Sequence, residues 1–367
     1  MLRFEGFSSC CGVYARVDLP AEAFDSEIQS RGTTNVDFNA PMRAALNQVR
    51  ETDEVRFSVG ADEFRLSQST GPVIEKKVAL PIRWIKGFMN VQSYLPTLKR
   101  RFEVSVSEAR RFVRSLPQSG APKTPSYVQP LGAGLRLSQR ESRESVRVMG
   151  IDRLRLLEPL LHQSKQVCIW SDDSSGTTGW EVIFENGRFL LFLSPEIWRG
   201  FSGEGQQLMR LAGNSWQAAF PYVKGALETR GPFEASQLAR RLNRNPSEVE
   251  AALAVLGARG LVGYDIVSGC YFPRELPFDL EKIELLQPRL NAARKLIAEQ
   301  KVQAPGHPAA DQPLMTEFVV QGTDVEHRVR LMPDGDKCTC PWYSKHRNER
   351  GPCKHILAAH LWIEGDR

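Results

Sequence analysis

The chain has 367 residues, of which 41% are hydrophobic and 25% charged, which is ordinary for a globular protein of two to four domains. This balance argues against disorder, and no apolar run approaches the roughly 18 residues that span a bilayer. The net charge of +5 permits a polyanionic partner without requiring one. The N-terminus lacks the apolar core of a secretory signal, so we expect a cytoplasmic protein that does not contact a membrane.

The first 116 residues alternate between strand and helix patterns and predict an α+β domain. Three segments alternate apolar and polar residues as half-buried strands do: 13–17, 55–59 and 63–66. Helical spacing follows Asn39, and a second helix is predicted to begin at Ser107 with Glu108 in its first turn. The Pro-rich residues 117–130 then predict a linker.

Residues 131–205 predict a second, β-rich α+β region. Two apolar segments flank a Ser/Gly-rich turn, and a third follows them: 167–170, 180–184 and 189–193. We therefore expect a long hairpin and a further strand. Asp172 and Asp173 lie in the turn, where adjacent aspartates are typical turn residues rather than paired catalytic carboxylates.

Residues 213–277 predict three helices and then a β-hairpin. Asn245 and Pro246 are typical of a helix start, with Glu248 three residues after the cap, and Gly260 is typical of a helix end. The stretch LARRLNRNPSEVEAALAVLGARGLVGYD resembles winged helix-turn-helix domains, a resemblance that indicates the fold more than the target.

The predicted third helix of this segment carries few side chains that read bases. DNA-reading helices present Arg, Lys, Asn or Gln to base edges, whereas this helix carries Glu248 and Glu250 among Ala, Val and Leu. A protein-binding or scaffolding role is at least as compatible with this composition. A separate basic concentration precedes the first linker: Arg100, Arg101, Arg110, Arg111 and Arg114.

A helical connector is predicted over residues 278–303, where Pro288 opens a helix whose apolar face should pack on a neighbouring domain. A second Pro-rich stretch follows. Residues 317–320 and 327–331 then predict a hairpin that leads directly into a cysteine cluster.

This cluster has the composition of a zinc site. Cys338 and Cys340 form one pair and Cys353 and His355 a second, with twelve residues between the pairs. Structural zinc takes four cysteine or histidine ligands in a tetrahedron, and four protein ligands leave no open position for a catalytic water. We expect the other four cysteines to be small hydrophobes: Cys10, Cys11, Cys168 and Cys270.

The order C-x-C-xₙ-C-x-H resembles the SWIM zinc finger family. The resemblance implies a ββα zinc module over residues 314–367, with zinc as the cofactor and DNA or other proteins as partners. His346 or His360 could replace the fourth ligand, although neither has the Cys-x-His spacing.

Cations surround the four predicted ligands, and two aromatic residues, Trp342 and Tyr343, lie among them. Lys and Arg neutralise phosphates and aromatic rings stack on bases, so we take the cations as candidate nucleic-acid contacts: Lys337, Lys345, Arg347, Arg350 and Lys354. A solvated charged surface is an equally good interpretation of the cations, and a core position is the better one for Trp342.

The sequence therefore predicts an α+β multidomain protein with a mixed N-terminal region, a winged-helix-like middle and a C-terminal ββα zinc module. We expect a non-enzymatic nucleic-acid-binding or recruiting protein without catalytic residues, because neither a phosphate-binding loop nor a hydrolase motif is present. The alternative is a protein-interaction adaptor within a larger assembly, for example an ATP-driven one. An active site in the N-terminal α+β region is a third hypothesis.

Overall fold

The computed structural model describes most of the chain. The described residues are 1–25, 32–50, 52–118, 124–195, 200–203, 216–229, 231–274, 287–303, 316–322, 325–332, 335–347 and 351–365. Among them, no helix is both long enough and apolar enough to cross a membrane.

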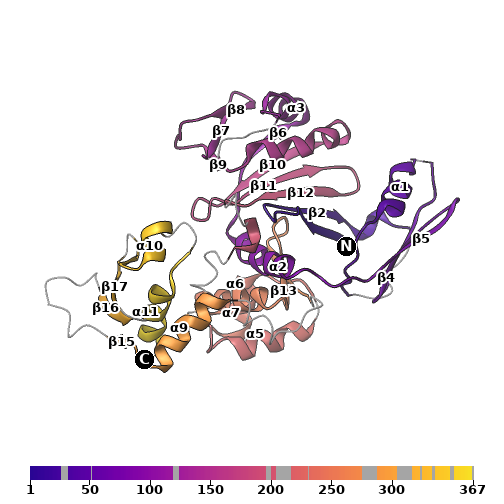
Figure 1. The fold of residues 1–367 in the computed structure, drawn as a ribbon. Helices are drawn as coiled ribbons and strands as arrows, with labels where there is room; N and C mark the ends of the chain where they lie inside the picture. The colour runs from indigo at the N-terminus through magenta and orange to yellow at the C-terminus, as the bar shows by residue number, and fades with distance from the viewer. Residues whose placement is uncertain are drawn as a thin grey trace.

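A six-stranded antiparallel sheet forms the centre of the N-terminal part (Figure 1). Its order is β1 (Leu2–Phe7), β2 (Val13–Leu19), β12 (Arg188–Leu193), β11 (Thr178–Ile183), β10 (Gln166–Ser171) and β6 (Lys99–Ser105). The first two strands and the last come from the segment before the Pro-rich linker, and the other three come from the segment after it. The predicted regions 1–116 and 131–205 therefore share one sheet. The first contains α-helices and strands, whereas the helical segments described in the second are 3₁₀ helices.

One face of this sheet is covered by a layer of helix and small sheet. The layer contains α3 (Val106–Ser115), the 3₁₀ segment η3 (Ile151–Gln163) and a three-stranded sheet of β7 (Ser126–Leu131), β8 (Gly134–Ser138) and β9 (Val146–Val148). Their apolar residues pack with Trp180 and Ile169 in one core cluster. Helix α3 begins one residue earlier than the Ser107 start predicted from sequence, because Ser105 caps it by accepting from the backbone N–H of Glu108.

The opposite face is covered by α2 (Ile82–Tyr94), which packs with Tyr14 and Phe192. A second small sheet of β3 (Arg56–Val59), β4 (Glu63–Gln68) and β5 (Gly71–Lys76) packs with α1 (Ala40–Gln48) beside Phe4 of β1. The predicted hairpin is formed by β10 and β11, and Asp172 accepts hydrogen bonds from Ser174 in its turn. Asp172 is therefore a turn residue, as predicted.

The middle of the chain forms the helices and hairpin in the predicted order. These are α5 (Phe220–Ala226), α6 (Ala235–Leu242), α7 (Pro246–Ala258), β13 (Val262–Asp265) and β14 (Cys270–Pro273). Asn245 caps α7 by accepting from the N–H of Ser247, and Gly260 takes the left-handed conformation (φ +71°) that ends the helix. We call these elements the three-helix unit; its assignment to the winged-helix family stays a prediction.

The three-helix unit packs tightly against the N-terminal sheet and α2. A side chain built at Gly257 of α7 would lie 3.3 Å from Cβ of Gln92 in α2, and Gln92 accepts from the backbone N–H of Tyr264 at 3.1 Å. Asp265 of β13 pairs with Arg16 at 3.0 Å and with Arg3 at 3.4 Å. The hairpin is thereby fixed to β1 and β2 by buried charges.

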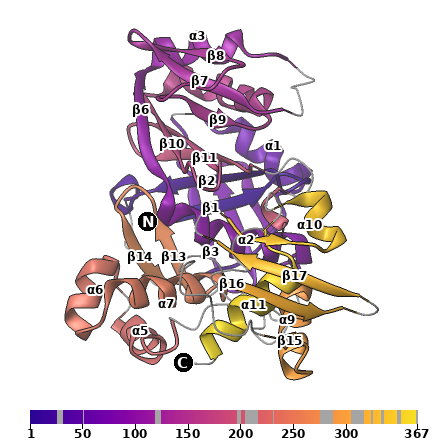
Figure 2. The same cartoon turned by 90° about the vertical axis from the view of Figure 1, so that its left-hand side faces the viewer.

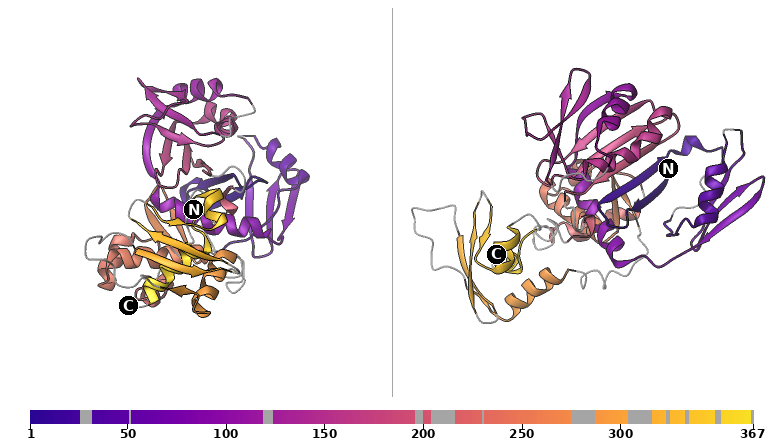
Figure 3. Two further views of the ribbon diagram at one scale, coloured as in Figure 1. Left: turned by 60° about the vertical axis from the view of Figure 1, so that its left-hand side comes forward. Right: turned by 45° about the horizontal axis from the view of Figure 1, so that its top comes forward.

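The C-terminal part has its own core and lies at the lower left of Figure 1. Its sheet order is β15 (Val302–Gln303), β16 (Thr316–Gln321), β17 (Glu326–Leu331) and β18 (Lys337–Cys338). Helices α9 (Pro288–Ala298), α10 (Pro341–His346) and α11 (Lys354–Gly365) complete it. Leu290, Ala293 and Leu296 of α9 belong to this core, so the predicted connector helix packs onto the C-terminal part (Figures 2 and 3).

Candidate metal centre

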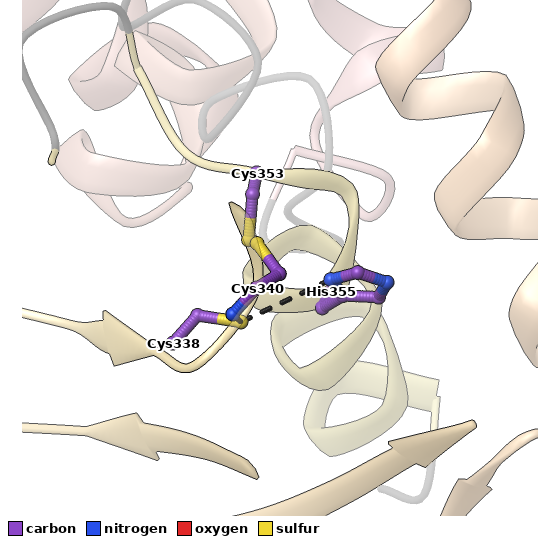
Figure 4. Close-up of side chains that lie close together, drawn as sticks. All are labelled: Cys338, Cys340, Cys353 and His355. Carbon is purple, nitrogen blue, oxygen red and sulfur yellow. Dashed lines mark hydrogen bonds between the residues drawn. The ribbon is translucent and has the colours of Figure 1, made fainter. Parts of the chain in front are cut away.

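Four buried side chains from three elements converge at one point of the C-terminal part (Figure 4). Cys338 ends β18, Cys340 is the N-cap of α10, Cys353 precedes α11 and His355 lies in its first turn. Their ligand atoms all lie within 4.8 Å of one another, and Nδ1 of His355 is 3.9 Å from Sγ of Cys338. The two pairs thus come together as the spacing predicts.

This arrangement fits a tetrahedral zinc ion. Zinc–sulfur bonds of about 2.3 Å place tetrahedral ligand atoms about 3.8 Å apart, close to the separations found here. Each of the four residues is less than 9% exposed, which excludes water from a site that already has four protein ligands. The donor set of three sulfurs and one imidazole is a common structural zinc set.

The backbone around the cysteines is arranged for thiolates. The N–H groups of Cys340, Tyr343 and Ile356 point at the sulfurs of Cys338, Cys340 and Cys353 at 3.4–3.5 Å. Such bonds stabilise negative charge on sulfur and orient the ligands. Pro341 at the first position of α10 has no N–H that would need a partner there.

The three thiols perturb one another strongly. A hydrogen bond to Cys340 raises the pKa of Cys338, while hydrogen bonds from Cys338 and Cys353 lower the pKa of Cys340. Three thiols this close together cannot all ionise without a cation between them, because like charges repel in a buried site. A divalent cation offsets this repulsion and allows all three sulfurs to be thiolates, and binding it releases protons.

The two alternative histidines have other contacts. Nε2 of His360 lies 2.7 Å from the Asp336 carboxylate, and the ring of His346 packs against Trp342 with centroids 4.4 Å apart. Since neither belongs to the cluster, His355 is the histidine that completes the ligand set.

Residues 327–360 match the family model of the SWIM zinc finger. The match begins in β17, includes all four clustered residues and ends in α11. The C-terminal part therefore carries a SWIM zinc finger that binds zinc through a Cys₃His cluster. No curated protein matches the chain.

The SWIM zinc finger is more elaborate than the predicted ββα module. The segment between the ligand pairs contains helix α10, and α9 joins from the preceding segment. Arg289 of α9 donates to the carbonyl of Pro352 at 2.7 Å and lies over the Trp342 ring, 4.7 Å from its centroid. Arg289 thus links α9 to the segment between the two ligand pairs. Its position in the sequence, far from the ligands, does not reveal this role.

The candidate nucleic-acid contacts lie around this site. Lys337, Lys345 and Arg347 are exposed and Lys354 is half-buried, while Arg350 lies outside the described residues. Arg347 ends α10 with a positive φ of 50° and packs over the Tyr343 ring. Trp342 is half-buried against the zinc finger core, the role favoured from sequence.

Proposed function

We propose that the protein is a non-enzymatic nucleic-acid-binding protein that contacts phosphates through the zinc loop, defined as residues 337–354. The observation that carries this proposal is a charge asymmetry. The zinc loop contains five Lys and Arg residues and one carboxylate, whereas the remainder of residues 314–367 contains three and seven. Positive charge is thus concentrated around the zinc ligands. Clustered cations attract a phosphate backbone more strongly than the same charges spread over the surface.

The packing of α7 argues against base recognition by the middle of the chain. In a winged helix this element would enter the major groove. Here its residues from Val255 to Ala258 are buried, and its end packs against α2. The hairpin is held to the sheet through Asp265. We therefore propose that the three-helix unit is a winged-helix scaffold and that binding is independent of base sequence.

The ligand count supports a role without catalysis for the zinc ion. Activation of water by zinc needs an open coordination position, and the Cys₃His set uses all four. The ion then contributes to function by holding β18, α10 and α11 together, which fixes the direction in which the zinc-loop cations point.

A salt titration tests the proposal. Binding of the full chain to a labelled DNA duplex is measured by anisotropy between 50 and 200 mM salt. Lys345→Ala with Arg347→Ala should reduce the steepness of the log–log salt dependence by about 1.8, the value for two lost phosphate contacts. The matched control is Lys295→Ala with Lys301→Ala, which removes two charges elsewhere in the same part of the chain and should leave the slope unchanged. Equal slopes for the two double variants would refute the zinc loop as the contact.

A protein-interaction adaptor is the second candidate. Residues 314–367 as a whole contain eight cations and eight carboxylates, and a neutral module with separated charges also suits a protein partner of complementary charge. Absence of DNA binding at 50 mM salt would favour this candidate. Affinity capture from native extract, compared between wild type and the Lys345/Arg347 variant, would then identify the partner.

A further inference from the structure

A second basic surface lies outside the zinc finger. Residues 99–165 contain fourteen Lys and Arg residues and six Asp and Glu, while the whole chain contains 48 and 43. The rest of the chain is therefore slightly acidic. Eleven of the fourteen cations are arginines, whose planar fork matches phosphate oxygens. We call this region the arginine lobe; it comprises β6, α3, β7–β9 and η3 and lies opposite the C-terminus in Figures 1 and 2.

Ion pairs neutralise part of the arginine lobe. The pairs within it are Arg100–Glu103 at 3.2 Å, Arg111–Glu108 at 3.0 Å, Arg114–Glu158 at 3.2 Å and Arg155–Glu158 at 3.3 Å. Most of these arginines lie on or beside α3. Two arginines of the β7–β9 sheet, Arg136 and Arg147, lack such ion pairs with described residues.

The outer face of the β7–β9 sheet presents arginines beside an aromatic ring. Tyr127 of β7 pairs with Ser138 of β8 and with Arg147 of β9, and Gln129 pairs with Arg136. Because alternate residues of a strand share a face, these side chains lie on one side, while the intervening valines pack into the core: Val128, Val146 and Val148. Arg136 and Arg147 are exposed, and neither forms an ion pair with a described residue.

Arg136 is held in place by a neutral partner. Oε1 of Gln129 accepts from both Nε and Nη2 of Arg136, at 3.1 and 3.0 Å. Gln129 is only 5% exposed, and its own Nε2 donates to the carbonyl of Arg140 at 2.9 Å. A carboxylate at this position would bind the fork and cancel its charge, whereas the amide orients the fork and leaves the charge available to an external anion.

We propose that the outer face of the β7–β9 sheet, formed by Arg136, Arg147 and Tyr127, is a second nucleic-acid contact that binds phosphates of a single strand. The two arginines bind the backbone, and half-buried Tyr127, on the middle strand between theirs, offers a stacking surface. The inference rests on the proposed nucleic-acid function, but it assigns the contact to a surface separate from the zinc loop. The connection from β8 to β9 adds little, because Glu141 and Glu144 there offset its arginines.

The test measures binding of the full chain to a labelled single-stranded oligonucleotide by anisotropy across salt concentrations. Arg136→Ala with Arg147→Ala should weaken binding about tenfold at low salt and reduce the steepness of the salt dependence by about 1.4. The control, Arg111→Ala with Arg114→Ala, removes the same charge from ion-paired arginines of the same lobe and should change affinity less than about threefold. Equal losses in both double variants, or no loss in the first, would overturn the assignment.

A charge-removing variant at an exposed position separates charge from folding. Arg136→Gln keeps a side-chain amide that can donate to Gln129 but removes the charge, so it should weaken binding without lowering the melting temperature. Unchanged affinity would contradict the proposal. If binding depends on the zinc-loop cations and not on Arg136 and Arg147, the proposed function stands and this inference fails. If the wild-type chain binds no nucleic acid at low salt, both fail.

Discussion

The zinc finger and the central sheet differ in how far apart in the sequence their contacting residues lie. The four zinc ligands lie between Cys338 and His355, so a short segment folds around one ion. The central sheet instead pairs β2 with β12, placing Val13 opposite Leu193. One region owes its stability to a few metal bonds, and the other to apolar burial between distant segments. A substitution that unfolds one of these regions should therefore leave the other folded.

The largest expected effect is loss of the metal. Cys353→Ser, or chelation of the wild type, should unfold the zinc finger together with α9, because zinc contributes on the order of 10–16 kcal/mol in small fingers and its cysteine ligands are themselves part of this core. Hydrogen exchange followed by mass spectrometry should show loss of protection over residues 288–365, while the central sheet keeps its protection.

The matched control is Cys270→Ser, which changes a half-buried cysteine outside the metal cluster. It should leave zinc content and exchange unaltered. Retained protection in the zinc finger of Cys353→Ser would show that its core folds without the ion, and loss of protection in both regions would show that the two are coupled.

The second effect concerns the central sheet and its contact with the three-helix unit. Arg16 is fully buried, and its charge is balanced by Asp18 and Asp265. Asp265→Ala leaves that charge incompletely paired and should lower the free energy of unfolding by about 3 kcal/mol, measured by urea denaturation. Asp173→Ala, which breaks an exposed pair with Arg101, is the control and should cost less than about 1 kcal/mol.

This ion pair also has a defined pH dependence. Burial raises the pKa of Asp265, but the charges of Arg16 and Arg3 and hydrogen bonds from Ser268 outweigh it and hold the pKa below its usual range. A lowered pKa means stabilisation that is complete above about pH 4 and lost as the pH falls through the folded-state pKa. The stability difference between wild type and Asp265→Ala should therefore shrink below pH 4; a constant difference would contradict this assignment.

Local signals in the sequence predict local structure well. The Asn245 cap, Gly260 and the order of the zinc ligands each specify geometry within a few residues, and each is found as predicted. The start of α3 differs because two serines compete, and Ser105 takes the cap. Such local signals do not specify which distant strands pair. The sequence therefore could not predict that strands from both sides of the first linker form one sheet.

Two features of the candidate sites also required the structure. Arg289 reaches the zinc loop from a helix more than sixty positions before Pro352, and nothing in its neighbourhood distinguishes it from a solvated arginine. Gln129 and Arg136 are brought together by the register of β7 and β8. The sequence shows a concentration of arginines between Arg100 and Arg114. Several of these arginines form ion pairs, so the unpaired arginines of the β7–β9 sheet are the better candidates for binding an anion.

A smaller effect is expected where α9 meets the zinc loop. Arg289→Ala removes the hydrogen bond to Pro352 and the contact with the Trp342 ring, and should lower the stability of the zinc finger by about 1–2 kcal/mol. Thermal unfolding followed by Trp fluorescence measures this shift. Arg289→Lys keeps the charge but not the planar fork, so it should recover only part of the loss. Full recovery would show that charge alone matters.

The smallest effect should come from the pair that joins the β17–β18 connection to α11. Asp336 and His360 are both partly exposed, with side chains 20% and 26% accessible, so solvent weakens their 2.7 Å contact. Asp336→Asn keeps the shape and removes the charge, and should destabilise the zinc finger by at most about 1 kcal/mol without altering zinc stoichiometry. The loss should be small because zinc joins β18 and α11 directly through its ligands. The melting temperature of the zinc-loaded protein measures it. A stability loss comparable to that of Cys353→Ser would mean that this pair, rather than the metal, fixes β18 against α11.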